Sequence, residues 1–219
     1  MSEAKKSGGL FHGLRDVAEK EFKFKQFACH NNAIHYKMQY PNAAMEKEGF
    51  CLPLACRYIA DFTSNSWTGF QATKNVKGAV TDLHMRTAEQ AAAVHLKYYL
   101  PNVALENYLA SVADSCGLTL KEFDSTDYFL WTEDAKWPKT DGNYIVNLSG
   151  VDWKRENKEV FHAVAIILSG GHMRFFDANI GGYKVKKENL QKFCDIYCQS
   201  YFGFGWEWHK FTLYTASRK

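Results

Sequence analysis

The spacing of apolar residues along the chain changes near Gly142. Before this point, apolar side chains recur at intervals of three to four residues, which is typical of amphipathic helices. The pattern predicts helices over residues 10–23, 51–62, 87–99 and 102–115. Pro101 marks the boundary between the last two, because proline interrupts a helix.

From Gly142 onward the apolar runs are short and are separated by glycine. The runs "NYIVNLSG", "FHAVAIILSGG" and "HMRFFDANIGGYKV" are typical of an antiparallel meander. A helix near 186–200 and a closing strand, "HKFTLYTA", complete the pattern. Helices followed by strands, with no βαβ alternation, indicate an α+β fold in which a helical N-terminal half packs on an antiparallel β-sheet. We expect a single domain over 1–219, with 1–25 as a candidate N-terminal helical extension.

Composition narrows the class of protein. Hydrophobic residues make up 46% of the 219 residues, which is enough for a sizeable core, and a 16% aromatic share favours a fold containing strands. The net charge of +3 comes without a concentrated basic face, so we expect no nucleic-acid partner. No apolar run approaches the roughly 18 residues of a membrane span, and the opening "MSEAKKSGGLFHG" lacks the apolar stretch of a signal peptide. This predicts synthesis in a cytosol without a cleaved signal.

The six cysteines form no CxxC pair, which favours reduced thiols over a disulfide framework. They stand at positions 29, 51, 56, 116, 194 and 198. Cys194 and Cys198 lie four residues apart on a predicted helix, where they have the spacing to bind zinc with Cys29, His30 or His35. Small buried thiols explain them more simply, so we expect no metal and no cofactor.

Cys51 stands at the predicted start of a helix, in "EGFCLPLAC". The N-terminus of a helix carries partial positive charge, which stabilises a thiolate. Pro53 supports this placement, because proline suits the first turn of a helix. Cys51 is therefore a candidate nucleophile, and a buried packing thiol is the alternative.

Two residues far downstream are suited to activate such a thiol. His162 opens an apolar strand, and Asp177 ends the next strand before the turn "ANIGG". If the two strands form a hairpin through "SGG", His162 and Asp177 become neighbours. The carboxylate then fixes the tautomer of the imidazole while the other ring nitrogen faces the thiol. A core histidine and an aspartate that only stabilises a turn are the alternatives.

The blocks "GFCLPLACRYI", "FHAVAIIL" and "FFDANIGGYK", in this order, resemble the three catalytic blocks of the YopT/AvrPphB-type effector cysteine proteases, which have a papain-like fold. The resemblance implies that Cys51 is the nucleophile, His162 the general base and acid, and Asp177 the residue that orients His162. The chain has Ala178 where the family's third block has proline.

A papain-like enzyme also needs an oxyanion hole. The backbone N–H of Cys51 is the natural first donor, and papain-like enzymes add a side-chain amide from just upstream. Asn42 and Gln39 are the candidates for that amide, and either is alternatively an ordinary turn or surface residue. Trp206 and Trp208 either line the cleft or are plain core or surface aromatics.

These features together predict a thiol protease acting on protein substrates. The resemblance implies a bacterial effector or toxin, made in the bacterial cytoplasm and secreted without a cleaved signal peptide into a host or rival cell. A chaperone or immunity protein as a further partner, and membrane association, are left open. A deamidase, transglutaminase or acyltransferase would use the same triad and acyl-enzyme, and a catalytically inactive binding module is the third alternative.

Overall fold

The computed structural model describes residues 11–24, 50–64, 82–98, 103–127, 138 and 140–219. Its helices are α3 (Cys51–Thr63), α5 (Asp82–Tyr98), α6 (Leu105–Ser115) and α8 (Leu190–Phe204). Its strands are β1 (Ala18–Phe22), β2 (Leu118–Asp127), β3 (Gly142–Asp152), β4 (Lys158–Ser169), β5 (His172–Asp177), β6 (Gly181–Lys186) and β7 (Trp206–Arg218). Short 3-10 helices are η1 (His12–Asp16), η3 (Trp153–Arg155) and η4 (Lys187–Asn189).

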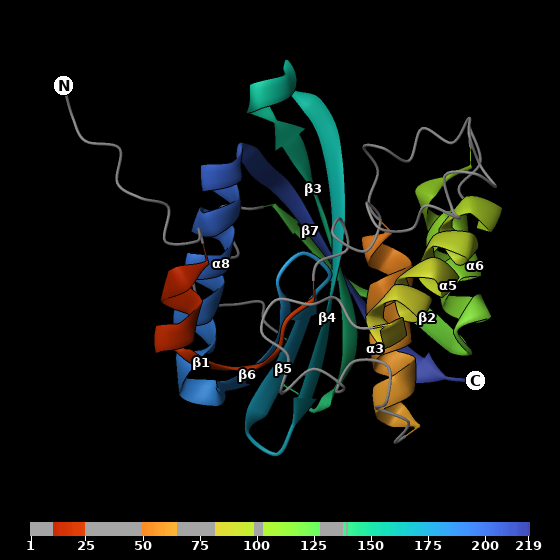
Figure 1. Cartoon of the computed structure of the whole chain (residues 1–219), viewed down its shortest axis with the longest axis horizontal. Helices are drawn as coiled ribbons and strands as arrows, with labels where there is room; N and C mark the ends of the chain where they lie inside the picture. Colours follow the sequence, from red (N-terminus) through yellow and green to blue (C-terminus); the bar gives the residue numbers. More distant parts are fainter. Residues whose placement is uncertain (1–10, 25–49, 65–81, 99–102, 128–137, 139) are drawn as a thin grey trace.

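The strands form one antiparallel sheet of seven, in the order β1-β6-β5-β4-β3-β7-β2. Helices cover both of its faces (Figure 1): α3, α5 and α6 lie on one side, and α8 lies on the other. The sheet is therefore the middle layer of three.

Strand β4 is apolar throughout its inner part because helices cover it from both sides. Ala163 and Ala165 belong to the core cluster that contains α3, whereas Val164 and Ile166 belong to the cluster that contains α8. Successive side chains of a strand point to opposite faces, so an uninterrupted apolar run is the expected sequence of such a strand. The small alanines allow α3 to approach the sheet closely.

The α+β class is confirmed, as are the helix predicted from Cys51 and the meander after Gly142. The helical region predicted near 186–200 is η4 followed by α8. The predicted boundary at Pro101 lies outside the described residues. The helix predicted near 186–200 adds a third layer to the predicted packing of helices on the sheet, because α8 covers the face opposite α3, α5 and α6.

The predicted helix over 10–23 is wrong in the residues that the structure describes, and the 1–25 extension stays a prediction because residues 1–10 and 25 lie outside them. Residues 12–16 form η1, and 18–22 form β1, which pairs with β6 at the edge of the sheet. The Lys20 ammonium donates to the Ile180 carbonyl, and the Phe22 ring packs against Gly182, where a Cβ would lie 2.3 Å from the ring. An open sheet edge overrides a helical pattern because it offers backbone hydrogen bonds and apolar contacts together.

Strand β2 was not predicted, although its ten residues pair with β7 along almost their whole length. Its outer side chains are exposed, and a bulge between Glu122 and Asp124 interrupts the pairing. An edge strand with few buried side chains leaves only a weak alternating pattern in the sequence.

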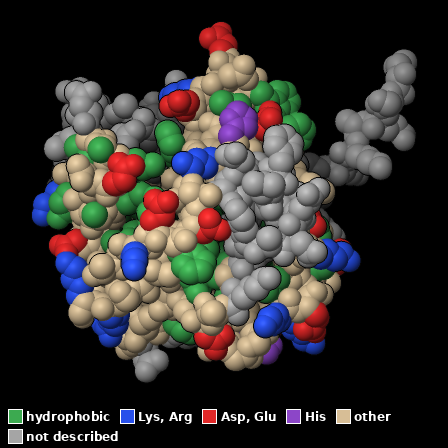
Figure 2. Space-filling model, turned by 180° about the vertical axis from the view of Figure 1, so that it is seen from behind, with side chains coloured by type: hydrophobic (Ala, Val, Ile, Leu, Met, Phe, Trp, Pro, Cys, Tyr) green, Lys and Arg blue, Asp and Glu red, His purple; other side chains and the backbone are tan. Residues whose placement is uncertain are grey.

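Charged side chains are mixed on the surface. On the face seen in Figure 2, Lys and Arg are interspersed with Asp and Glu over the described residues. Within that same part of the chain, no helix is long and apolar enough to cross a membrane.

Candidate active site

Strand β5 ends at Asp177, and beyond that residue an opening is left beside β4. The hairpin between β4 and β5 turns through Gly170 and Gly171, both with positive φ, and its last paired residues are Val164 and Asp177. Beyond this pair β4 continues to Lys158 against β3, while β5 no longer runs beside it. The predicted hairpin is thus confirmed. From Ala163 back to Lys158, the edge of β4 that faces away from β3 is not paired with β5.

Cys51 occupies this opening. The backbone N–H of Ala163 donates to Cys51 Sγ over 3.3 Å, so the sulfur takes the place that a carbonyl of a neighbouring strand would have. Cys51 is the first residue of α3, and only 8% of it is exposed. Pro53, in the first turn, has no N–H to leave without a partner. The sulfur therefore lies at the positive end of α3, held against β4.

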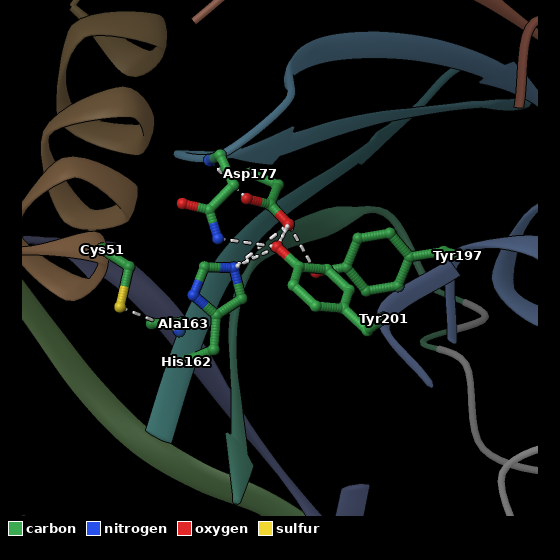
Figure 3. A network of polar contacts seen from close by, with 7 residues as sticks. Cys51, His162, Ala163, Asp177, Tyr197 and Tyr201 are labelled. Carbon is green, nitrogen blue, oxygen red and sulfur yellow. Dashed lines mark hydrogen bonds and ion pairs between the residues drawn. The ribbon is translucent and has the colours of Figure 1, made fainter. Parts of the chain in front are cut away.

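The His162 ring lies between Cys51 and Asp177 (Figure 3). Its Nε2 is 3.1 Å from Asp177 Oδ2, and its Nδ1 points toward Cys51. Because a carboxylate accepts at Nε2, that nitrogen carries the hydrogen, which fixes the tautomer. His162 is 2% exposed, so these protein groups rather than bulk water determine its protonation.

The Asp177 carboxylate is completely buried and accepts hydrogen bonds on both oxygens. Oδ1 accepts from the Asn179 backbone N–H at 2.6 Å, which is an Asx turn. Oδ2 accepts from the hydroxyls of Tyr197 at 2.6 Å and Tyr201 at 2.7 Å, in addition to its contact with His162. Asp177 therefore both stabilises the turn and faces the imidazole.

Electrostatics favour an imidazolium in this position. Burial by itself would lower the pKa of His162, but the Asp177 carboxylate, Cys51 and their hydrogen bonds outweigh it and raise that pKa to about 10. Burial likewise acts to raise the pKa of Asp177, and the charge of His162 together with the surrounding donors lowers it below its usual range. The pairing of Asp177 with His162 therefore favours a protonated His162 ring beside the Cys51 sulfur.

Aromatic rings surround the imidazole on the α8 side. Its centroid lies 5.4 Å from that of Tyr201 and 6.1 Å from that of Trp206. Trp208 is stacked on it at 6.2 Å with planes 16° apart, and Trp208 is buried. Both predicted tryptophans therefore lie against His162, Trp208 as a core residue and Trp206 partly exposed.

The other candidate residues are divided between the core and the part of the chain not described. Asn42 and Gln39, the oxyanion-hole candidates, lie outside the described residues, as do Cys29, His30 and His35. Cys56, Cys194 and Cys198 are buried. Within the described ranges, no group of three or more His, Cys, Asp or Glu side chains has an arrangement that could hold a metal ion.

Sequence reasoning missed the residues that hold Asp177. Tyr197 and Tyr201 stand one turn apart in α8, and Asn179 follows Asp177 in the turn. Two tyrosines spaced i, i+4 in "YCQSY" indicate one helix face. Nothing in that spacing says that the face lies against the end of β5.

No family model matches the chain, and no curated protein does. Among solved structures, the chain is similar to that of the Pseudomonas avirulence protein AvrPphB, with a TM-score of 0.60 and 13% sequence identity. The similarity covers 93% of this chain and 99% of AvrPphB. The chain therefore shares its fold with a protein that gives its name to the family which the three sequence blocks resemble.

Proposed function

We propose that the protein is a papain-like cysteine protease in which Cys51, His162 and Asp177 form the catalytic triad. The observation that carries the proposal is the meeting of these residues from three separate elements: a helix start, the edge of one strand and the end of the next. A packing thiol does not need an imidazole whose second nitrogen is held by a buried carboxylate. The shared fold with AvrPphB supports the same assignment.

In the proposed reaction the Cys51 thiolate attacks the carbonyl carbon of a peptide bond. The C–S bond forms as the carbonyl π electrons move to oxygen, which gives a tetrahedral oxyanion. The Cys51 N–H, at the start of α3, is one donor for that oxygen, since the first N–H groups of a helix have no partner within it. An upstream amide, Asn42 or Gln39, is the proposed second donor.

His162 carries the proton through both halves of the reaction. As an imidazolium it gives its Nδ1 proton to the leaving amine when the C–N bond breaks. The neutral ring then takes a proton from water, which attacks the thioester and releases the second product and the Cys51 thiolate. Asp177 keeps Nε2–H in place during both transfers.

The substrate class that follows is a protein of the cell that the enzyme enters. AvrPphB is named as an avirulence protein of Pseudomonas, and we propose for this chain the role of an effector or toxin delivered to a host or rival cell without a cleaved signal peptide. A chaperone or immunity protein in the producing cell belongs to this proposal.

The decisive experiment is an unbiased search for new protein N-termini in a cell lysate incubated with the purified protein. Wild type and Cys116→Ala should generate the same new termini, and Cys51→Ala should generate none. Cys116 is a suitable control because it is a partly buried thiol at the end of α6. Termini that persist in Cys51→Ala would refute the assignment.

The same samples distinguish the related chemistries. A deamidase would leave protein termini unchanged and add about one dalton to a glutamine or asparagine side chain, since water then attacks a side-chain acyl-enzyme. A transglutaminase would add to a glutamine side chain the mass of an amine less that of the ammonia released, and an acyltransferase would add an acyl group to its acceptor. A catalytically inactive binding module would change neither, and it would enrich partners equally with and without the Cys51 sulfur.

A further inference from the structure

The Tyr201 hydroxyl lies in the buried network next to the Tyr197 hydroxyl, which shares its acceptor Asp177 Oδ2, and close to three further polar groups. Its oxygen is 2.7 Å from Asp177 Oδ2, 2.8 Å from Asn179 Nδ2 and 3.2 Å from His162 Nε2. A hydroxyl has one hydrogen to donate and two lone pairs with which to accept. The hydrogen goes to the carboxylate, which can only accept, and one lone pair accepts from the Asn179 amide.

The second lone pair is then directed to the imidazole. His162 carries its hydrogen on Nε2, where the two nearest acceptors are Asp177 Oδ2 at 3.1 Å and Tyr201 Oη at 3.2 Å. The nearly equal distances indicate a shared hydrogen bond from one N–H to both oxygens.

We propose that Tyr201 is a positioning residue, whose hydroxyl is a second acceptor for the Nε2–H of His162. The inference rests on the proposed role of His162 as base and acid. Rotation of the ring about its Cβ–Cγ bond would then break two hydrogen bonds rather than one. The ring is confined further by Trp208, which stacks on it.

Tyr197 provides a matched comparison one helical turn away. Its hydroxyl donates to the same Asp177 oxygen at 2.6 Å, and it is buried like that of Tyr201. Within the described part of the chain, no hydrogen bond joins the Tyr197 hydroxyl to His162. Replacing either tyrosine with phenylalanine removes one donor to Asp177, but only Tyr201→Phe also removes an acceptor from the imidazole.

The two changes have different effects on the protonation of His162. Loss of one donor leaves the Asp177 carboxylate a stronger acceptor for His162, which raises the pKa of the ring in both variants. Loss of the Tyr201 acceptor also weakens the hydrogen bond of the imidazolium, which lowers that pKa. Tyr197 acts on the ring only through Asp177. The groups that face the ring are Asp177 from β5, Cys51 from α3, Tyr201 from α8, and Trp206 and Trp208 from β7.

The test is an NMR titration of the His162 ring nitrogens in the full chain carrying Cys51→Ala, which removes the titration of the thiol. We expect the pKa of His162 in Tyr201→Phe to lie below that in Tyr197→Phe by about half to one pH unit. Equal values in the two variants would overturn the proposal. If Tyr201→Phe does not fold, a cross-relaxation signal between the His162 Nε2–H proton and the Tyr201 ring protons beside the hydroxyl decides instead, and its absence would count against the contact.

A second readout uses an identified substrate. Tyr201→Phe should lower kcat about tenfold with little change in KM, and Tyr197→Phe should lower it about twofold. Equal losses of kcat in the two variants would mean that Tyr201 acts only by holding Asp177, and they would overturn the proposal. If the wild-type protein cleaves nothing, the proposed function fails while the titration still decides whether Tyr201 holds His162.

Discussion

At the scale of single residues, the position of Asp177 does not depend on the histidine that it faces. Three of its four hydrogen bonds come from Tyr197, Tyr201 and the Asn179 backbone. The carboxylate therefore stays in place whether the imidazole is charged or neutral. On the proposed function, such an orienting group is preorganised, because its position costs no rearrangement during the reaction.

Substitution of Asp177 should affect turnover and stability together. Asp177→Ala removes the acceptor of four buried donors, so we expect a loss of several powers of ten in kcat/KM and of about 1–3 kcal/mol in stability for each donor left unpaired. Asp177→Asn should lose less. Its oxygen can take the Oδ2 position, and its NH₂ then opposes only the Asn179 N–H. Kinetics on one substrate and melting curves check both variants, and near-wild-type turnover of Asp177→Ala would remove it from the triad.

The charges of the pair should make stability depend on pH. A histidine in an unfolded chain has a pKa near 6.5, whereas that of folded His162 is about 10. The folded state holds this proton more tightly, so the stability it contributes is full below about pH 6.5 and is lost as the pH rises toward 10. The stability that Asp177 contributes depends on pH in the opposite direction. Because folding lowers the pKa of Asp177, this stability is lost as the pH falls into the acid range.

We therefore expect the melting temperature to fall between pH 6.5 and pH 10, and His162→Gln to flatten this fall. Melting curves of both proteins across that range measure the effect. If the melting temperatures of the two proteins fall in parallel with pH, the pKa of His162 does not rise on folding.

Cys51 should react faster with iodoacetamide at pH 6 than Cys116 does. Cys51 lies beside the His162 ring, which can take up its proton, whereas burial raises the pKa of the Cys116 thiol. Site-resolved mass spectrometry of a labelling time course compares the two thiols in one sample. A Cys51 rate no greater than that of Cys116 would contradict an activated nucleophile.

At the scale of secondary-structure elements, the end of β5 determines where the site forms. Beyond Val164, β4 presents its outer edge to α3 instead of to another strand. Phe161 lies on the same face of β4 as Ala163, about 7 Å further along the strand, and its side chain is 53% exposed. On the proposed function, an apolar substrate side chain next to the scissile bond would cover this ring.

Phe161→Ala should therefore weaken substrate binding without unfolding the protein. Burial of a ring of this size contributes about 1.5–3 kcal/mol, so we expect kcat/KM to fall about tenfold or more, mainly through KM. Phe123→Ala is the matched control, because Phe123 is 58% exposed on β2, the far edge strand. Equal kinetics in the two variants would place Phe161 outside the substrate path.

Elements with local signals were predictable, and elements defined by distant contacts were not. Pro53 in a first turn and two glycines between apolar runs specify a helix start and a hairpin from neighbouring residues alone. Those two signals placed Cys51, His162 and Asp177. Strand β1 depends on an edge of β6 that the chain forms far downstream, and the tyrosines of α8 depend on the packing of that helix, so neither follows from local periodicity.

At the scale of the whole molecule, α3, β1 and β5 meet in an aromatic cluster beside the site. The Phe176 ring, next to Asp177 but on the other face of β5, stacks on Tyr58 of α3 with centroids 4.7 Å apart. It also contacts Phe22 of β1 at 5.9 Å and Phe24 at 5.8 Å. The Phe176 side chain of β5 thus connects α3 to β1.

Phe176→Ala should destabilise the protein by about 3–5 kcal/mol, because it leaves a cavity that its neighbours fill only in part. Phe123→Ala should cost less than about 1 kcal/mol, since its side chain is mostly exposed. Chemical denaturation of both variants measures the difference. A loss for Phe176→Ala as small as that for Phe123→Ala would mean that the cluster does not hold these elements together.

The order of the elements along the chain has a consequence for the nascent chain. The ribosome completes α3 and β4 before α8 and β7, so Tyr197, Tyr201 and Trp208 leave it after Cys51, His162 and Asp177. Until they emerge, His162 lacks two of the groups that hold it and Asp177 lacks two of its donors. On the proposed function, a nascent chain that has not yet released α8 and β7 therefore has the thiol but no fixed imidazole to activate it.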